Sequence, residues 1–315
     1  MNTDVKKTNI KEVLSRGRIF IIFLALFILM SILRTNSFLN YTNIMNLLKQ
    51  ISVNTILAVG MTLVMTTGCF DLSVGSVVGA VGIVVGLCAQ SNMPIVVIFF
   101  VAAAVGAIFG VLNGLAIAIF KIPSFIVTLA MMQIARGVAY IISNGFPVGN
   151  FDKSYLVIGQ GFFLGLPIPV YIMIIVVFLM WIVMSKTKFG RHVYFVGGNE
   201  ESSRLCGINV FAIRVISHTL CSILAGIAAI VLTFRVASAM PGAGEGYEMD
   251  AIAASVIGGC SLNGGVSNMW GTLIGALILG IISNGMNLLG ITTYPQMIIK
   301  GVIIFAAVLL DTRKK

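Results

Sequence analysis

The stretch PIVVIFFVAAAVGAIFGVLNGLAIAI, residues 94–119, decides the fold class because it contains a single clearly polar side chain, Asn113. A second stretch, residues 164–184, contains no Asp, Glu, Lys, Arg, Asn or Gln. About 20 helical residues cross the roughly 30 Å hydrocarbon core of a bilayer. A membrane β-barrel would instead alternate apolar and polar positions over short segments, and no such alternation occurs here. The sequence therefore predicts an all-α, polytopic membrane protein.

Composition supports this class: 58% of the residues are hydrophobic and only 10% are charged, whereas about a quarter are charged in a soluble domain. The net charge of +10 comes from cations at both chain ends and in residues 185–210, as expected for cytoplasmic segments. The lipid bilayer, not nucleic acid, is thus the expected partner. The five cysteines form no C-x-x-C pair and the two histidines lie in different segments, so no metal site, disulfide or cofactor is predicted.

Ten membrane spans are plausible. They lie near residues 19–34, 50–67, 72–90, 94–119, 122–142, 164–184, 211–236, 248–262, 267–290 and 295–311. Residues 1–18 form a basic cytoplasmic segment and residues 19–315 a single transmembrane domain. No small-residue cleavage site follows the first apolar run, so that span is expected to stay uncleaved. Basic residues at both ends favour an even number of crossings, although 248–262 is short and could be a half-helix that turns back.

Small residues recur at helix-packing spacing. The rows are Gly75 and Gly79, Gly82 and Gly86, Gly106, Gly110 and Gly114, and Gly271 and Gly275. Such rows let helices approach closely, and we expect packing within one subunit, with a subunit interface as the alternative. Two segments form a weak internal repeat: Gly68-Cys69 and Gly259-Cys260 are each followed by polar residues and a glycine-rich span. Matching helix interruptions often surround the substrate route of a transporter, but chance explains one short repeat equally well.

The run Gly68-Cys69-Phe70-Asp71-Leu72-Ser73-Val74-Gly75-Ser76 places a carboxylate between two apolar segments. An ionisable side chain inside a bilayer is costly and usually marks a substrate or ion route. Asp71 is the only deeply placed acid that the sequence indicates. Capping of the following helix is the alternative role, and the two roles are compatible. Three asparagines suit hydroxyl-rich solutes, or else bond neighbouring helices. The predicted pathway residues are Phe70, Asp71, Ser73, Asn113, Asn284 and Asn287.

Motifs for chemistry are missing from the sequence. There is no G-x-x-x-x-G-K-[ST] loop for nucleotide phosphates, no nucleophile elbow and no H-E-x-x-H pair. The chain is therefore not expected to be an enzyme or to hydrolyse ATP itself. Arg136, Arg214 and Lys300 fall near span ends, where snorkelling or pairing is the expected role.

The loop 185–210 carries its own helix signals. Asn199 is a suitable N-cap for residues 200–206, the acids at 200 and 201 suit the positive helix end, and Gly207 can end the turn. A short helix that projects from a membrane protein is a natural docking element for a soluble partner. A merely solvated helical loop is the alternative.

At these residues the chain closely resembles the ribose-type permeases of bacterial ABC importers, the monosaccharide branch of the carbohydrate-uptake transporters. The resemblance covers most of the chain beyond residue 18. Its segments are Gly60–Val64, Phe70–Ser76, Gly197–Asn209, Gly244–Ala254, Trp270–Ala276 and Asn284–Leu289. Departures from the family pattern are modest and fall at Cys69 and at Ser202 or Ser203.

The resemblance implies a homodimer in the bacterial cytoplasmic (inner) membrane, a cytoplasmic ATPase with two nucleotide-binding modules, and an extracytoplasmic sugar-binding protein. By the same analogy, the loop at 198–207 is the coupling helix that receives the ATPase stroke. Its expected coupling residues are Gly198, Asn199, Glu200, Arg204 and Gly207.

Our hypothesis is a permease subunit that imports ribose or a related monosaccharide by alternating access, with ATP hydrolysed by a partner. Xylose, galactose, autoinducer-2 and nucleosides stay open as solutes. The rivals are an ion-coupled secondary transporter and a passive channel. Neither rival has a use for a coupling loop.

Overall fold

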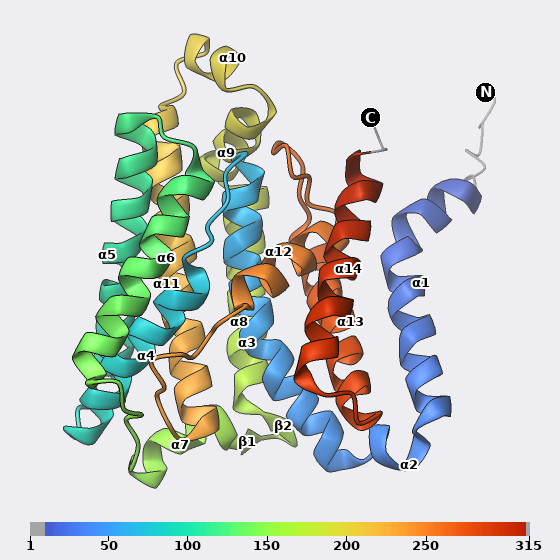
Figure 1. Cartoon of the computed structure of the whole chain (residues 1–315). Coiled ribbons are helices and arrows are strands. Elements are labelled where there is room, and N and C mark those ends of the chain that lie inside the picture. The colour runs from blue at the N-terminus through green and yellow to red at the C-terminus, as the bar shows by residue number, and fades with distance from the viewer. Residues whose placement is uncertain (1–9, 313–315) are drawn as a thin grey trace.

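The computed structural model describes residues 10–312, and the side chains of residues 19–306 and 309 (Figure 1). The basic residues predicted to mark the cytoplasmic ends at positions 1–9 and 313–315 lie outside the described part. The helices are α1 (Ile10–Leu33), α2 (Thr35–Phe38), α3 (Tyr41–Thr66), α4 (Val74–Gln90), α5 (Ile95–Phe120), α6 (Ser124–Ser143), α7 (Lys153–Gln160), α8 (Ile168–Lys186), α9 (Lys188–Gly198), α10 (Glu200–Leu205), α11 (Val210–Val236), α12 (Tyr247–Ile257), α13 (Met269–Leu288) and α14 (Thr293–Thr312).

Six of these helices are long and apolar enough to cross a membrane: α3, α5, α6, α8, α11 and α13. Shorter apolar helices cover Ile19–Leu33, Val74–Gln90 and Thr293–Ala306. The prediction of a helical, polytopic membrane protein is thereby confirmed, whereas the count of about ten spans is not. Helix α12 has 11 residues, or about 16 Å of helix at 1.5 Å per residue, which is too short to cross the hydrocarbon core.

One small sheet departs from the all-α prediction. Strands β1 (Phe162–Phe163) and β2 (Leu166–Pro167) form an antiparallel pair between α7 and α8. Gly165 in the turn has a φ of 81°, which favours glycine. Helix α8 consequently begins at Ile168, beyond the predicted start of the span at residue 164.

Glycines on α5 bring its backbone against α11. A Cβ added at Gly110 would lie 2.5 Å from the carbonyl oxygen of His218 and 2.6 Å from the Cα of Thr219. Gly106 and Gly114 meet the α11 backbone in the same way. The expected packing of this glycine row within one subunit is confirmed, and it closes α5 over the polar residues of α11.

Helices α4 and α12 both begin at mid-height of the helix bundle (Figure 1). Helix α12 lies at mid-height beside α4 and α3, and the irregular segment before it runs across one face. Helices α9 and α10 lie at one end, together with the start of α1 and the end of α14, whereas α7, β1 and β2 lie at the opposite end (Figure 1). The predicted cytoplasmic loop thus shares an end with both termini of the described chain.

Candidate translocation site and coupling helix

The polar run after residue 67 interrupts the membrane helices, as predicted. Helix α3 ends in a glycine turn in which the Gly68 N–H donates to the Met65 carbonyl at 2.9 Å and the Cys69 N–H to the Val64 carbonyl at 3.3 Å. Gly68 has a φ of 79°, which makes it a suitable residue for this αL helix end. The chain then reaches α4 through a short irregular segment and a turn, in which Asp71 and Ser73 are buried.

Asp71 is fully buried. Its Oδ1 accepts hydrogen bonds from the Ser73 N–H at 3.0 Å and the Ser73 hydroxyl at 2.5 Å. Ser73 itself is the N-cap residue of α4 and makes no side-chain capping bond. Asp71 therefore accepts a hydrogen bond from the backbone N–H of Ser73, the N-cap residue of α4, which lies two positions further along the chain.

Asn113 joins this group from α5. Its Nδ2 donates to the Ser73 hydroxyl at 2.9 Å, and the residue is fully buried. His218 of α11, also fully buried, interacts electrostatically with Asp71. We call Asp71, Ser73, Asn113 and His218 the Asp71 cluster. Sequence reasoning missed His218, although a histidine inside an otherwise apolar segment was a usable signal.

Three polar atoms of the Asp71 cluster have no hydrogen-bond partner within the described residues: Asp71 Oδ2, Asn113 Oδ1 and His218 Nε2. The His218 Nδ1 lies 2.9 Å from the Arg214 carbonyl oxygen, so Nδ1 carries a proton there. Buried unpaired polar atoms are expensive and are usually matched by a proton, a water or a moving neighbour. The cluster thus has three side-chain atoms that could each still form a hydrogen bond.

Phe70 directly precedes Asp71 in the break and is half-buried. Its N–H donates to the Ser124 hydroxyl at 3.0 Å, which ties the break to the start of α6. The residue also lines a cavity of about 750 Å³ together with Lys121, Glu200 and Arg214. The break and the loop 185–210 therefore share one cavity wall.

Asn284 and Asn287 lie elsewhere. Asn284 exchanges two amide hydrogen bonds with Asn43 of α3, at 2.8 and 3.2 Å. Asn287 accepts from Gln296 Nε2 at 2.7 Å. Both are near the end of α13, away from α10 (Figure 1). The six predicted pathway residues thus separate into two groups, one at the break before α4 and one at the opposite end.

Acids at the start of α12 correct the statement that Asp71 is the only deeply placed one. Asp250 is buried, and its Oδ2 forms an ion pair with the Lys300 ammonium of α14 at 2.8 Å. Glu248 is half-buried in the same helical turn. Arg136 of α6 holds the preceding segment by donating to the carbonyls of Pro241 and Ala243 at 2.6 and 2.8 Å. The spacing of Glu248 and Asp250 near Gly244 and Gly246 was the available signal.

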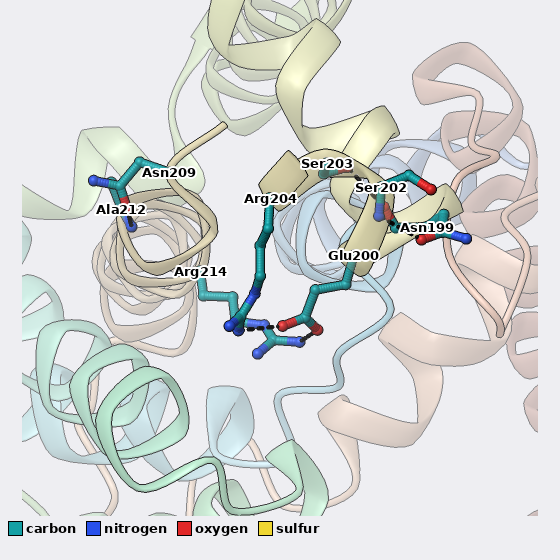
Figure 2. Close-up of polar contacts among 8 residues, drawn as sticks. All are labelled: Asn199, Glu200, Ser202, Ser203, Arg204, Asn209, Ala212 and Arg214. Atoms are coloured by element: carbon teal, nitrogen blue, oxygen red, sulfur yellow. Dashed lines mark hydrogen bonds and ion pairs between the residues drawn. The ribbon is translucent and has the colours of Figure 1, made fainter. Parts of the chain in front are cut away.

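The predicted helix of loop 185–210 is α10; its start after Asn199 is confirmed, and it ends at Leu205, one residue before the predicted end at residue 206. Asn199 is its N-cap and accepts from the Ser202 N–H at 2.8 Å. Gly207 follows its last turn with a φ of 77°. In Figure 2 the Glu200 carboxylate lies between Arg204 of α10, at 2.6 Å, and Arg214 of α11. Glu200 therefore connects α10 to the membrane helix whose next turn carries His218.

Comparison with known proteins is consistent with this geometry. Residues 43–308 match the family described as the branched-chain amino acid transport system, permease component. The chain belongs to this permease family. It is 46% identical over 298 residues to the ribose import permease protein of Escherichia coli (strain K12), with 93% of each chain covered. The ribose import permease protein of Bacillus subtilis (strain 168) is 40% identical, with 100% of this chain and 98% of the relative covered.

A third relative, the L-arabinose transport system permease protein of Escherichia coli (strain K12), is 37% identical over 97% of this chain and 94% of its own length. No solved structure matches the chain.

In this permease, glycines pack the end of α9 against two segments: the turn at Gly68 and the segment that follows Gly259-Cys260. These are the two similar segments noted in the sequence. A Cβ at Gly264 would lie 2.8 Å from the Gly197 oxygen and 2.8 Å from the Gly68 nitrogen. The Gly265 N–H donates to the Thr66 carbonyl at 3.0 Å. Backbone contacts at these positions leave no room for side chains. The two interrupted regions and the end of α9 consequently form one junction beside α10.

Proposed function

We propose that this chain is the membrane-spanning subunit of an ATP-driven importer for ribose or a related monosaccharide. The similarity to two ribose import permeases over nearly the whole chain carries this proposal. Solute passes by alternating access between outward and inward states. ATP binding in a partner supplies the free-energy difference between these states, because a ligand shifts a conformational equilibrium by its differential affinity.

The proposed partners are a cytoplasmic ATPase with two nucleotide-binding modules, an extracytoplasmic sugar-binding protein and a second copy of this chain. The exposed α10, capped at both ends and attached through Glu200 to α11, supports ATPase docking. We further propose that α1, α4 and α14 are membrane-embedded beside the six long spans, while α12 is a half-helix.

Glu200→Gln tests the proposed coupling route. The substitution removes the charge that bridges Arg204 and Arg214, so we expect sugar uptake to fall several-fold while the protein stays folded, since exposed ion pairs contribute only about 0–1 kcal/mol to stability. Uptake and ATPase activity are measured with the reconstituted complex. Glu201→Gln is the matched control, because Glu201 is exposed and makes no ion pair within the described residues.

Equal uptake by the two variants would contradict the role of Glu200.

Asp71→Asn separates the importer from an ion-coupled carrier: the importer keeps its dependence on ATP, whereas a proton-coupled carrier loses uptake driven by a pH gradient. Solute flux through the chain alone, without ATPase, would instead indicate a channel.

A further inference from the structure

A polar cavity lies at the end of the molecule opposite α10. Its volume is about 470 Å³, within the roughly 300–1,000 Å³ of small-molecule sites, and its lining residues come from α3, α7 and α11. They are Asn46, Lys49, Gln50, Gln160 and Arg235. We call this cavity the outer pocket. None of its residues belongs to the predicted pathway or to the Asp71 cluster.

Both cations of the outer pocket are already engaged. The Lys49 ammonium donates to the Gln160 carbonyl at 3.0 Å and lies 4.5 Å from the centre of the Phe162 ring. Arg235 interacts with the hydroxyl of Tyr247, the first residue of α12. Gln160 Nε2 in turn donates to the Arg235 carbonyl at 3.1 Å. These contacts fix the wall of the pocket.

Two carboxamides remain available. Asn46 is exposed and Gln50 half-exposed, and neither side chain is hydrogen-bonded to another residue in the described part of the chain. They lie one helical turn apart on α3, so both can face the same space. A carboxamide offers two donors and an acceptor oxygen. This pairing matches hydroxyl groups, each of which donates and accepts.

The wall of the outer pocket includes a residue that interacts with α12. Arg235 connects its wall to Tyr247, and α12 then carries Glu248 and Asp250 at mid-height in the bundle. One residue of the pocket wall, Arg235, is thereby linked to the first residue of α12. The residues of the Asp71 cluster, by contrast, are fully buried.

We propose that the outer pocket receives the transported solute, a neutral, hydroxyl-rich molecule of monosaccharide size, and that Asn46 and Gln50 hydrogen-bond its hydroxyls. This inference rests on the proposed function and adds the site of entry. Replacement of both residues by leucine keeps side-chain volume similar and breaks no hydrogen bond within the described protein, so folding is expected to persist.

The test uses the complete complex in liposomes, with binding protein and labelled ribose outside and ATP inside. For Asn46→Leu with Gln50→Leu we expect ribose accumulated per ATP hydrolysed to fall about tenfold, since two hydrogen bonds to the solute are lost, while ATPase stimulation by the binding protein is unchanged. Lys153→Gln is the control, because it removes an exposed cation of α7 that does not line the pocket. Parallel loss of ATPase stimulation would assign the pocket to protein docking and overturn the proposal, as would unchanged uptake.

A second measurement separates this proposal from the proposed function. In the full complex carrying Gln160→Cys and Cys206→Ser, which keeps Asn46 and Gln50, an impermeant maleimide labels position 160 in the pocket wall from outside, and we expect ribose to slow the labelling several-fold. The other four cysteines are buried. No protection overturns the pocket even where ATP-driven uptake succeeds, and protection by ribonate alone overturns the neutral class. Protection without ATP-driven uptake would instead contradict the importer while leaving the pocket in place.

Discussion

The Asp71 cluster and the outer pocket both contain polar side chains, but those of the cluster are enclosed by packed helices and those of the pocket border a cavity. Asp71, Ser73, Asn113 and His218 are fully buried, and three of their polar atoms are unpaired within the described residues. The carboxamides of Asn46 and Gln50 border a cavity instead. Residue type alone therefore does not distinguish a closed polar group from one that is open to a ligand. Helix packing does, because the glycines of α5 close it onto α11 around the Asp71 cluster, whereas Asn46 and Gln50 on α3 still border an open cavity.

The largest effect is expected from opening the closed region. Gly110→Leu forces a side chain into the His218 carbonyl and the Thr219 backbone, so α5 and α11 must separate, at a cost expected to reach the upper end of the about 1–3 kcal/mol that overpacking usually costs. Thermal unfolding and yield of monodisperse protein in detergent report the loss. Gly137→Leu on α6 is the control, since no atom lies within 4 Å of its added Cβ. A stable Gly110→Leu variant would refute the packing explanation of burial.

A smaller effect is expected within the Asp71 cluster. Asp71→Ala leaves the Ser73 N–H and hydroxyl without their acceptor, which costs about 1–3 kcal/mol for a buried group. Asp71→Asn keeps an acceptor and adds a donor near unpaired acceptors, so its unfolding temperature should exceed that of Asp71→Ala. If Asp71→Ala unfolds like the parent yet abolishes uptake, the cluster contacts solute and the contrast with the outer pocket fails.

The smallest effect concerns the amide pair of Asn43 and Asn284. A double-mutant cycle with alanine at each position should give a coupling free energy near the ~0.6 kcal/mol average for polar contacts between membrane helices. Unfolding measurements of the four proteins provide it. Uptake is expected to change little. A coupling of zero together with lost uptake would restore Asn284 to the solute pathway.

Sequence patterns predicted features that depend on nearby residues. The apolar run 94–119 lies almost wholly within α5, because hydropathy over about 20 residues is enough to favour a spanning helix. Asn199 and Gly207 bound α10 because capping acts within one helical turn. The ten-span count is not confirmed, and α12 is too short to cross, because an apolar composition does not show where a helix breaks.

By itself, the sequence determined the helical membrane class, the interruption at residues 67–73 and the position of the α10 helix, since each follows from local hydropathy, glycine placement or capping. Only the tertiary structure decided that His218 joins Asp71, that Asn284 pairs with Asn43, and that α3, α7 and α11 enclose the outer pocket. Those groupings join residues tens to hundreds of positions apart. They depend on which helix faces pack together, and a side chain's local sequence does not specify its distant neighbours.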